Sequence, residues 1–358
     1  MGKRIVIMAG GTGGHVFPAL AVAQWLIDQG WQVSWLGTQK GLESRVVPEN
    51  GIDIDWLSVS GVRGKGLPAK IMAVFRLLQA CVQALKILRK RKPDVVLGMG
   101  GFVAGPGGLM AKLLGIPLVI HEQNRIPGTT NRLLARFANQ VLEAFPDSFS
   151  QKVAAHCTGN PLRKHFLTAV EQLEKPFRAE VRVLVVGGSQ GAQVLNETVP
   201  LAVCELQQAD LALPKVQIKH QTGAAMHASV AEQYQSLGIN ADVQAFIDDM
   251  VAAYQWADLI ICRAGAMTVS EVAAMGVPAI FVPLANAIDD HQTANARFLT
   301  DVGAGLLLKQ SDLNSISLAD TITAALKHLT AMSYAAQGCA RLDATEVVAG
   351  YCIAEAGL

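Results

Sequence analysis

Residues 258–295 read DLIICRAGAMTVSEVAAMGVPAIFVPLANAIDDHQTAN, and this stretch decides the fold class. A short apolar run at 259–261 ends at an Arg-Ala-Gly turn, and a helical pattern then covers residues 267–275 until a glycine and a proline close it. A second apolar run follows at 279–282. Because strand, glycine turn, helix and strand make a βαβ unit, the sequence predicts an α/β protein with parallel sheets.

The predicted helix of this unit begins just beyond the carboxyl end of a strand, where free backbone N–H groups favour a phosphate. Thr268 adds a hydroxyl group in its first turn, and Glu271 can accept two hydrogen bonds at once from a diol. After the second strand, the Asp-Asp-His-Gln cluster at 289–292 opens the next helix, where a sugar could bind. Each feature alone is compatible with a helix cap or a solvated loop, whereas together they favour a nucleotide-sugar site.

The chain has 358 residues, of which 51% are hydrophobic and 16% charged, so it can bury the cores of two domains. Residues 1–160 hold 18 Lys and Arg against 9 Asp and Glu, a net charge of +9, whereas residues 161–358 hold 12 against 20, a net charge of −8. A basic half favours an anionic partner, either a phosphate or an anionic membrane surface. Nucleic acid is not an expected partner, because the basic residues are not interleaved with aromatic ones.

The six cysteines form no CxxC pair and no histidine stands at metal-ligand spacing, so we expect reduced thiols, a cytosolic protein and no metal site. Asp53 and Asp55 match an Asp-x-Asp pattern that binds metal–nucleotide complexes in some enzymes, but the alternation around them favours a half-exposed strand. The apolar stretches at 3–9 and 95–120 are too short or too interrupted by glycines to span a membrane.

Two glycine-rich turns divide the chain into similar halves. GGTGGH at 10–15 stands between a predicted strand at 5–8 and a predicted helix at 19–29, and GGSQGA at 187–192 follows a predicted strand at 181–186. This repeat predicts two Rossmann-like domains that face each other across a cleft. The first turn is neither a P-loop nor a GxGxxG motif, and no acidic residue stands at 37–38 for a ribose, so no nicotinamide cofactor is expected.

The stretch from residue 61 to residue 92 passes from a basic loop into a long predicted helix. Four apolar residues fall at i, i+3, i+4 and i+7 on one face of that helix: Ile71, Val74, Phe75 and Leu78. Three cations lie close by in the sequence: Lys65, Lys70 and Arg76. The face either belongs to the core or is an apolar patch that rests on an anionic membrane surface.

Taken together, seven motifs resemble those of the MurG family of bacterial N-acetylglucosaminyltransferases, over nearly the whole chain. They are GGTGGH at 10–15, RGKG at 63–66, HEQN at 121–124, GNPLR at 159–163, GGSQGA at 187–192, FIDDM at 246–250 and CRAGAMTVSE at 262–271. The resemblance implies a GT-B fold and no cofactor. It also implies an inverting transfer of N-acetylglucosamine from UDP-N-acetylglucosamine (UDP-GlcNAc) to the 4-hydroxyl group of the N-acetylmuramyl unit of lipid I, which gives lipid II.

The resemblance places the donor UDP-GlcNAc on residues from both halves of the chain: Thr12, Gly13, Gly14, Asn124, Arg163, Ser189, Ile247, Ala266, Met267, Thr268, Glu271, His291 and Gln292. Their chemistry agrees, since Arg163 and Ser189 suit a diphosphate and the backbone of Ile247 suits a base. Whether His291 or Gln292 contacts the sugar stays open, because histidine stands where some family members carry a second glutamine.

An inverting transfer needs a general base for the acceptor hydroxyl group and stabilisation of the departing UDP. His15 in the first glycine turn is the first candidate for the base, with a structural role in the turn as the alternative. Glu122 is the second candidate, in a polar segment expected just after a strand at 117–120. Arg163 and a helix N-terminus could neutralise the diphosphate without a metal.

The resemblance further implies an acceptor- and membrane-binding domain at 1–161, with a helix from 341–358 packed back on it, and a UDP-GlcNAc-binding domain at 162–340. The implied location is the cytoplasmic face of the bacterial inner membrane, as a peripheral protein beside proteins of cell-wall synthesis and division. Two other interpretations stand beside this one. A UDP-GlcNAc 2-epimerase would use the same donor without a lipid acceptor, and a nucleotide-sugar sensor at the membrane would bind the donor without turnover.

Overall fold

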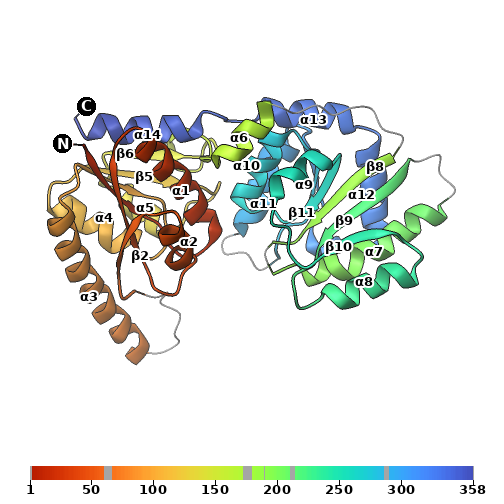
Figure 1. Cartoon of the computed structure of the whole chain (residues 1–358), viewed down its shortest axis with the longest axis horizontal. Coiled ribbons are helices and arrows are strands. Elements are labelled where there is room, and N and C mark those ends of the chain that lie inside the picture. Colours follow the sequence, from red (N-terminus) through yellow and green to blue (C-terminus); the bar gives the residue numbers. More distant parts are fainter. Residues whose placement is uncertain are drawn as a thin grey trace. The chain divides into compact units, whose positions relative to one another are not determined.

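The structure is a computed structural model that describes residues 2–59, 67–171, 180–188, 190–209, 214–285 and 290–357, without the side chains of residues 67–71 and 73. The chain divides into two compact units (Figure 1). Unit 1 contains residues 1–163 and 341–358, and unit 2 contains residues 164–340.

Unit 1 is built on a seven-stranded parallel sheet with the strand order β3-β2-β1-β4-β5-β6-β7. Its strands are β1 (Arg4–Met8), β2 (Gln32–Gly37), β3 (Asp53–Trp56), β4 (Val95–Gly98), β5 (Leu118–Glu122), β6 (Gln140–Glu143) and β7 (His156–Cys157). The chain moves outward from β1 to β3 and then returns to the other side of β1 for β4. Such a switch point is where parallel sheets bind ligands, beyond the carboxyl ends of the strands.

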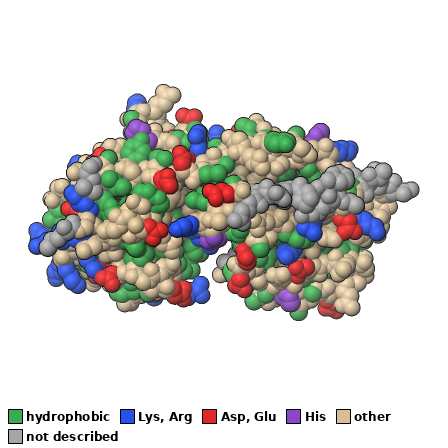
Figure 2. All heavy atoms as spheres, turned by 45° about the horizontal axis from the view of Figure 1, so that its top comes forward, with side chains coloured by type: hydrophobic (Ala, Val, Ile, Leu, Met, Phe, Trp, Pro, Cys, Tyr) green, Lys and Arg blue, Asp and Glu red, His purple; other side chains and the backbone are tan. Residues whose placement is uncertain are grey.

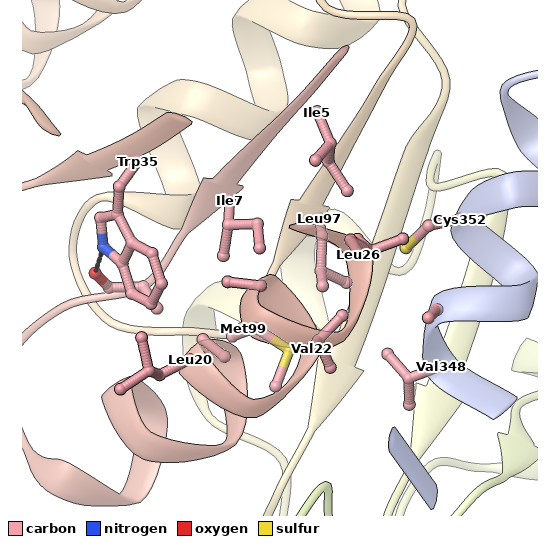
Figure 3. Close-up of a cluster of buried hydrophobic side chains, with 14 of the residues drawn as sticks. Ile5, Ile7, Leu20, Val22, Leu26, Trp35, Leu97, Met99, Val348 and Cys352 are labelled. Carbon is pink, nitrogen blue, oxygen red and sulfur yellow. Dashed lines mark hydrogen bonds between the residues drawn. The ribbon is translucent and has the colours of Figure 1, made fainter. Parts of the chain in front are cut away.

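Helices cover both faces of this sheet: α1 (Gly13–Asp28), α2 (Glu43–Glu49), α3 (Leu67–Arg91), α4 (Ala104–Leu113), α5 (Thr129–Leu134) and α14 (Ala344–Glu355). Successive side chains of β1 point to opposite faces, so Ile5 and Ile7 join the core beneath α1 and α14 (Figure 3). Val6 and Met8 join the core beneath α3 and α4. Burial on both faces explains why β1 is a continuous apolar run.

The last helix of the chain belongs to unit 1 although all of unit 2 precedes it. Val348 and Cys352 of α14 lie in the same buried cluster as Leu97 of β4 (Figure 3). A polar contact supports this packing, since the Lys3 ammonium group donates to the Ala356 carbonyl oxygen at 2.9 Å.

Unit 2 repeats the arrangement on a six-stranded parallel sheet with the order β10-β9-β8-β11-β12-β13. Its strands are β8 (Glu180–Val186), β9 (Lys215–Gln221), β10 (Ala241–Gln244), β11 (Leu259–Cys262), β12 (Ala279–Phe281) and β13 (Gly305–Leu307). Its helices are α6 (Lys164–Glu171), α7 (Gln193–Gln208), α8 (His227–Ser236), α9 (Met250–Trp256), α10 (Ala266–Met275), α11 (His291–Thr300), α12 (Ser315–Leu326) and α13 (Leu329–Gly338). The predicted βαβ unit is confirmed as β11, α10 and β12, and the switch point lies between β8 and β11.

Two element boundaries predicted from the sequence were wrong. Helix α1 begins at Gly13 instead of Ala19, because the Thr12 carbonyl oxygen accepts the backbone N–H of His15 at 3.1 Å and closes a first turn that glycines alone do not favour. Strand β5 continues through Glu122 instead of ending at residue 120, because its polar end pairs in register with β6.

Candidate active site

In unit 1, the turns that follow β1 and β4 meet at the switch point of the sheet. A side chain at Gly101, in the turn after β4, would collide with the carbonyl oxygen of Gly10, in the turn after β1. Both Gly100 and Gly101 have positive φ angles, of 96° and 79°. The second glycine-rich turn therefore lets the backbone of the first turn approach closely.

His15 lies in the first turn of α1, half-buried beside this contact. Its Nδ1 atom is 3.5 Å from the hydroxyl oxygen of Thr12. A Cβ atom placed on Gly100 would lie 2.7 Å from Cδ2 of the His15 ring, so the imidazole packs directly against the backbone of the second turn. A glycine in the turn after β4 thus leaves the space that this ring occupies.

Arg163 comes to the same end of α1. Its guanidinium carbon is 4.9 Å from the centre of the Phe17 ring, a cation–π geometry. The Phe17 ring in turn lies next to Gly13, where an added Cβ atom would be 2.8 Å from it. The structure therefore brings Arg163 to the N-terminal part of α1 through Phe17, a residue that the sequence did not single out.

His121, Glu122 and Gln123 are buried, and the first two belong to β5, which corrects the expectation of a polar loop at 121–124. Glu122 is 2% exposed, and its carboxylate accepts N–H groups from Asn124, Gly128 and Asn131 at 2.9–3.2 Å. A carboxylate occupied by donors in this way organises the loop that follows β5, and this geometry argues against Glu122 as a general base. The sequence showed only that four polar residues follow each other.

His121 connects this segment to the GNPLR motif. Its Nε2 atom is 2.9 Å from the Gly159 carbonyl oxygen, and its Nδ1 atom is 3.0 Å from the Gln123 amide nitrogen. Burial lowers the pKa of His121 to about 4, so the ring is neutral near pH 7, donates through Nε2 and accepts through Nδ1. Because Arg163 ends the same GNPLR motif, this bond helps to fix the approach to Arg163.

In unit 2, the turns that follow β8 and β11 occupy the corresponding switch point. Helix α10 begins at Ala266 after the N-cap residue Gly265, which has no side chain to bond the first N–H groups of the helix. Met267 and Thr268 are half-buried in the first turn. An N-terminus of this kind suits a phosphate group.

Glu271 lies one turn further along α10 and is half-buried. Its Oε2 atom accepts a hydrogen bond from the hydroxyl group of Tyr254 at 3.2 Å. Tyr254 is itself 1% exposed and packs edge-on against Phe166. The carboxylate is therefore aimed by a rigid neighbour that the sequence analysis had not connected with it.

Gln221 at the end of β9 joins two segments that the sequence assigned to the donor. Its amide nitrogen donates to the Gly188 carbonyl oxygen at 2.8 Å, and its amide oxygen accepts the Ile247 N–H at 2.9 Å. The N–H of Ile247 is therefore engaged inside the protein. A single glutamine gave no sequence signal, since only the fold places it between these segments.

The turn after β8 also packs against the turn after β9. A Cβ atom on Gly191 would collide with the Thr222 carbonyl oxygen, so these backbones touch. Behind them His220 is fully buried, 3.0 Å from the Tyr234 hydroxyl oxygen and 3.2 Å from Oδ1 of Asn196. Burial lowers the pKa of His220 to about 3, so it supports the turns as a neutral ring.

The cluster after β12 is described from Asp290 onward. Gln292 accepts the backbone N–H of Leu284 at 3.0 Å, which uses the oxygen of its amide and keeps the amide nitrogen as a donor. Asn295 of α11 donates to the Ala264 carbonyl oxygen at 3.2 Å and so ties this helix to the turn after β11. His291 is the first residue of α11. Asp289, Ser189 and Lys65 lie outside the described residues.

Arg263 holds the end of β12 and was not singled out from the sequence. Its guanidinium group donates to the carbonyl oxygens of Val282 and Pro283 and to the Gln310 side chain, at 2.9–3.2 Å. Burial lowers its pKa. It thereby fixes the point at which the chain leaves β12 toward the cluster at 290–292.

The Asp-x-Asp pair binds an arginine. Arg91, at the end of α3, donates to Asp53 at 2.9 Å and to Asp55 at 2.6 Å. Because each carboxylate has this cationic partner, the pair acts as an ion-pair network that joins α3 to β3.

The apolar stripe on α3 is exposed to solvent over its described part. The exposed fractions of Val74, Phe75 and Leu78 are 58%, 66% and 60%, so these three residues do not belong to the core of unit 1. Arg76 is exposed beside them, whereas the side chains of Lys70 and Ile71 lie outside the described residues. Within the described ranges, none of the helices is long and apolar enough to cross a membrane.

Two family models match the chain: the glycosyltransferase family 28 N-terminal domain over residues 5–143, and the glycosyltransferase family 28 C-terminal domain over residues 182–347. A protein of Methylococcus capsulatus named UDP-N-acetylglucosamine–N-acetylmuramyl-(pentapeptide) pyrophosphoryl-undecaprenol N-acetylglucosamine transferase is 60% identical over 360 residues, covering 100% of both chains. A protein of the same name from Shewanella frigidimarina is 49% identical over 355 residues, covering 98% of this chain and 96% of that protein.

The fold is shared with solved structures. The crystal structure of Acinetobacter baumannii MurG matches with a TM-score of 0.83 and 42% identity, covering 98% of this chain and 99% of that one. A UDP-GlcNAc 2-epimerase from Neisseria meningitidis matches with a TM-score of 0.69 at 12% identity, over 98% and 100% of the chains, a likeness of fold alone. The predicted GT-B fold is confirmed, and the chain belongs to glycosyltransferase family 28, in the MurG family.

Proposed function

We propose that this chain transfers N-acetylglucosamine from UDP-GlcNAc to the 4-hydroxyl group of the N-acetylmuramyl unit of lipid I, the undecaprenyl-pyrophosphoryl-linked pentapeptide precursor, and so forms lipid II. The observation that carries the proposal is the pairing, on α10, of an N-terminus without a side-chain cap and a carboxylate aimed by Tyr254 at 3.2 Å. A diphosphate and a ribose diol are the two features of a nucleotide sugar that these groups would bind. The relatives named above carry the same activity in their names.

We assign the donor to the switch point of unit 2. Thr268 and the N–H groups at Ala266 and Met267 hold phosphate oxygens, Glu271 accepts the ribose hydroxyl groups, and the Ile247 carbonyl oxygen accepts an N–H of the base. The family resemblance adds Ser189, Asn124 and the turn at 12–14 to the donor contacts that we propose. Gln292 donates to the sugar through the amide nitrogen that its bond to Leu284 leaves available. His291 is the alternative contact for the sugar.

We assign the acceptor chemistry to the switch point of unit 1. His15 takes the proton of the acceptor 4-hydroxyl group while its oxygen attacks the anomeric carbon of the donor. The bond from that carbon to the diphosphate breaks on the opposite side, UDP leaves with the electron pair, and the configuration inverts. Arg163 stabilises the negative charge on the leaving diphosphate. Glu122 is a positioning residue, since its carboxylate already binds the loop after β5.

The exposed apolar stripe of α3 is proposed as a contact with an anionic membrane. Lys86, Arg89, Lys90 and Lys92 are exposed further along the same stretch of chain. Figure 2 shows Lys and Arg side chains gathered on unit 1, at the left of the view. Apolar insertion and cationic attraction together provide the two signals that reversible membrane binding needs. We place the protein at the cytoplasmic face of the inner membrane, where proteins of cell-wall synthesis and division are its expected neighbours.

The proposal is tested by incubating the protein with UDP-GlcNAc labelled in the sugar and a short-chain lipid I analogue. Transfer of label to the analogue, with release of one UDP per sugar, is the expected result. Release of N-acetylmannosamine from the donor alone would instead identify an epimerase. Tight binding of UDP-GlcNAc with no turnover of either kind would identify a sensor and overturn the proposal.

A further inference from the structure

Glu43 is a fully buried carboxylate that the sequence analysis did not single out. It begins helix α2 and is 0% exposed. Three donors surround it: the Gly11 N–H at 2.9 Å, the Thr38 N–H at 2.9 Å and the Thr38 hydroxyl group at 2.7 Å. Burying a carboxylate costs free energy unless hydrogen-bond donors surround it, and here three donors do so.

Three glycines make room for this one carboxyl group. A Cβ atom on Gly10 would lie 2.6 Å from its Oε1 atom, a Cβ atom on Gly37 would lie 2.8 Å from its Cγ atom, and a Cβ atom on Gly41 would collide with Oε2. Gly10 lies in the turn after β1, Gly37 is the last residue of β2, and Gly41 lies in the connection between β2 and α2. The backbone is therefore shaped around the Glu43 side chain, not around an empty space.

The contacts lead from Glu43 to the proposed base. Gly11 has a positive φ angle of 99° and is held on both sides, by Glu43 through its N–H and by the Leu42 N–H through its carbonyl oxygen at 3.3 Å. The next residue, Thr12, is the N-cap of α1, and its carbonyl oxygen accepts the N–H of His15 at 3.1 Å. A chain of contacts thus links Glu43 through Gly11 and Thr12 to the first turn of α1.

We propose that Glu43 is a positioning residue for the transfer reaction, which holds the glycine turn at 10–14 so that His15 meets the acceptor hydroxyl group. This inference rests on the proposed role of His15. A carboxylate suits the site because each of its two oxygens accepts a backbone N–H, from Gly11 or from Thr38. With glutamine in either amide orientation, one backbone N–H would face the amide NH₂ group, and the turn would move.

The test measures kcat, donor KM, UDP affinity and thermal stability in Glu43→Gln, with Glu49→Gln as a control, since Glu49 is an exposed carboxylate on the same helix. We expect Glu43→Gln to lower kcat about 10- to 100-fold and to weaken UDP binding by a smaller factor, because the turn at 12–14 is also proposed to contact the donor. The control should leave all four quantities unchanged. An unchanged kcat in folded Glu43→Gln overturns the inference.

A double-mutant cycle separates positioning from general weakening of the fold. In a His15→Ala background, Glu43→Gln should lower kcat by less than about twofold, because the group that it positions is absent. A full multiplicative loss in the double variant would show that Glu43 acts elsewhere and would overturn the inference. If His15→Ala alone leaves kcat unchanged, the proposed base is wrong, which is a different failure.

Should Glu43→Gln fail to fold, Thr38→Val provides the same cycle by removing one of the three bonds to the carboxylate. We expect this variant to lower kcat about 3- to 10-fold, and to lose that effect in the His15→Ala background. A folded Thr38→Val with wild-type kcat counts against the inference.

Discussion

The turn after β1 and the turn after β8 occupy the same place in their sheets, but different side chains hold them. The second glycine of each turn has nearly the same φ angle, 99° at Gly11 and 101° at Gly188. Glu43 holds Gly11 through its N–H, and Gln221 holds Gly188 through its carbonyl oxygen. A carboxylate can only accept, whereas an amide both donates and accepts.

This difference suits two tasks. In unit 1 the carboxylate collects N–H and O–H donors from two connections and fixes one turn, the one that carries His15. In unit 2 the amide bridges the turn after β8 and the segment at Ile247, so it couples two parts of the proposed donor site. Changes around the first turn should therefore alter the rate more than donor affinity, and changes around the second should alter donor affinity more than the rate.

The largest effect is expected at His15. His15→Ala removes the proposed general base and should lower kcat by about 10²- to 10⁴-fold, with UDP affinity unchanged. Steady-state kinetics with a soluble acceptor and calorimetric titration of UDP check this, with exposed His328 replaced by alanine as the control. A collapse of UDP affinity with high residual turnover would show that His15 has a structural role in its turn. The proposed division, with the rate depending on unit 1 and donor affinity on unit 2, would then be wrong.

The next effect concerns Glu271 in unit 2. Glu271→Ala removes a charged acceptor of two hydrogen bonds, so donor KM should rise by about 30- to 700-fold, equivalent to about 2–4 kcal/mol. The KM for the acceptor should stay within about threefold, because unit 1 is untouched. Glu271→Gln, which keeps one acceptor oxygen, is the matched variant and should give an intermediate donor KM. A donor KM within threefold of wild type for Glu271→Ala would remove this residue from the site.

A smaller effect is expected for Gln221→Glu, which tests whether Gln221 has a different role from Glu43. The new carboxylate can still accept the Ile247 N–H but can no longer donate to the Gly188 carbonyl oxygen. UDP affinity should fall about 5- to 100-fold, and kcat at saturating donor should change by less than about threefold. Gln235→Glu places the same charge at an exposed position and is the control. Loss of kcat without loss of UDP affinity would show that Gln221, like Glu43, acts on the rate.

The smallest effect on the reaction is expected on α3, whose exposed face has been assigned to the membrane. Replacing Val74, Phe75 and Leu78 together by serine should leave kcat with a soluble acceptor unchanged and the melting temperature nearly so, because these side chains are exposed. Binding to anionic vesicles in a sedimentation assay should fall about 10-fold. Vesicle binding that is insensitive to this change and to raised salt would show that α3 does not face the membrane. A large fall in melting temperature would show that the stripe belongs to the core.

Much of the fold could be predicted because it depends on local patterns. Apolar runs such as 259–261 that end in glycine turns specify parallel strands and their helices, and the repeated turns specify two similar units. The stripe of α3 shows where local pattern fails. A spacing of i, i+3, i+4 and i+7 is the same for a core face and an exposed apolar face, and only packing against neighbours distinguishes them.

By itself, the sequence determined the α/β class, the two glycine turns, the family and the residue types suited to a diphosphate and a diol. Only the tertiary structure decided which buried side chains hold those turns. Glu43 lies 32 residues from Gly11, and Gln221 lies 33 residues from Gly188. Neither has a recognisable motif, because a hydrogen bond across two strand connections depends on where the sheet brings the chain together and not on spacing along it. Burial then decides the outcome, since a polar group without water must find its partners inside the fold.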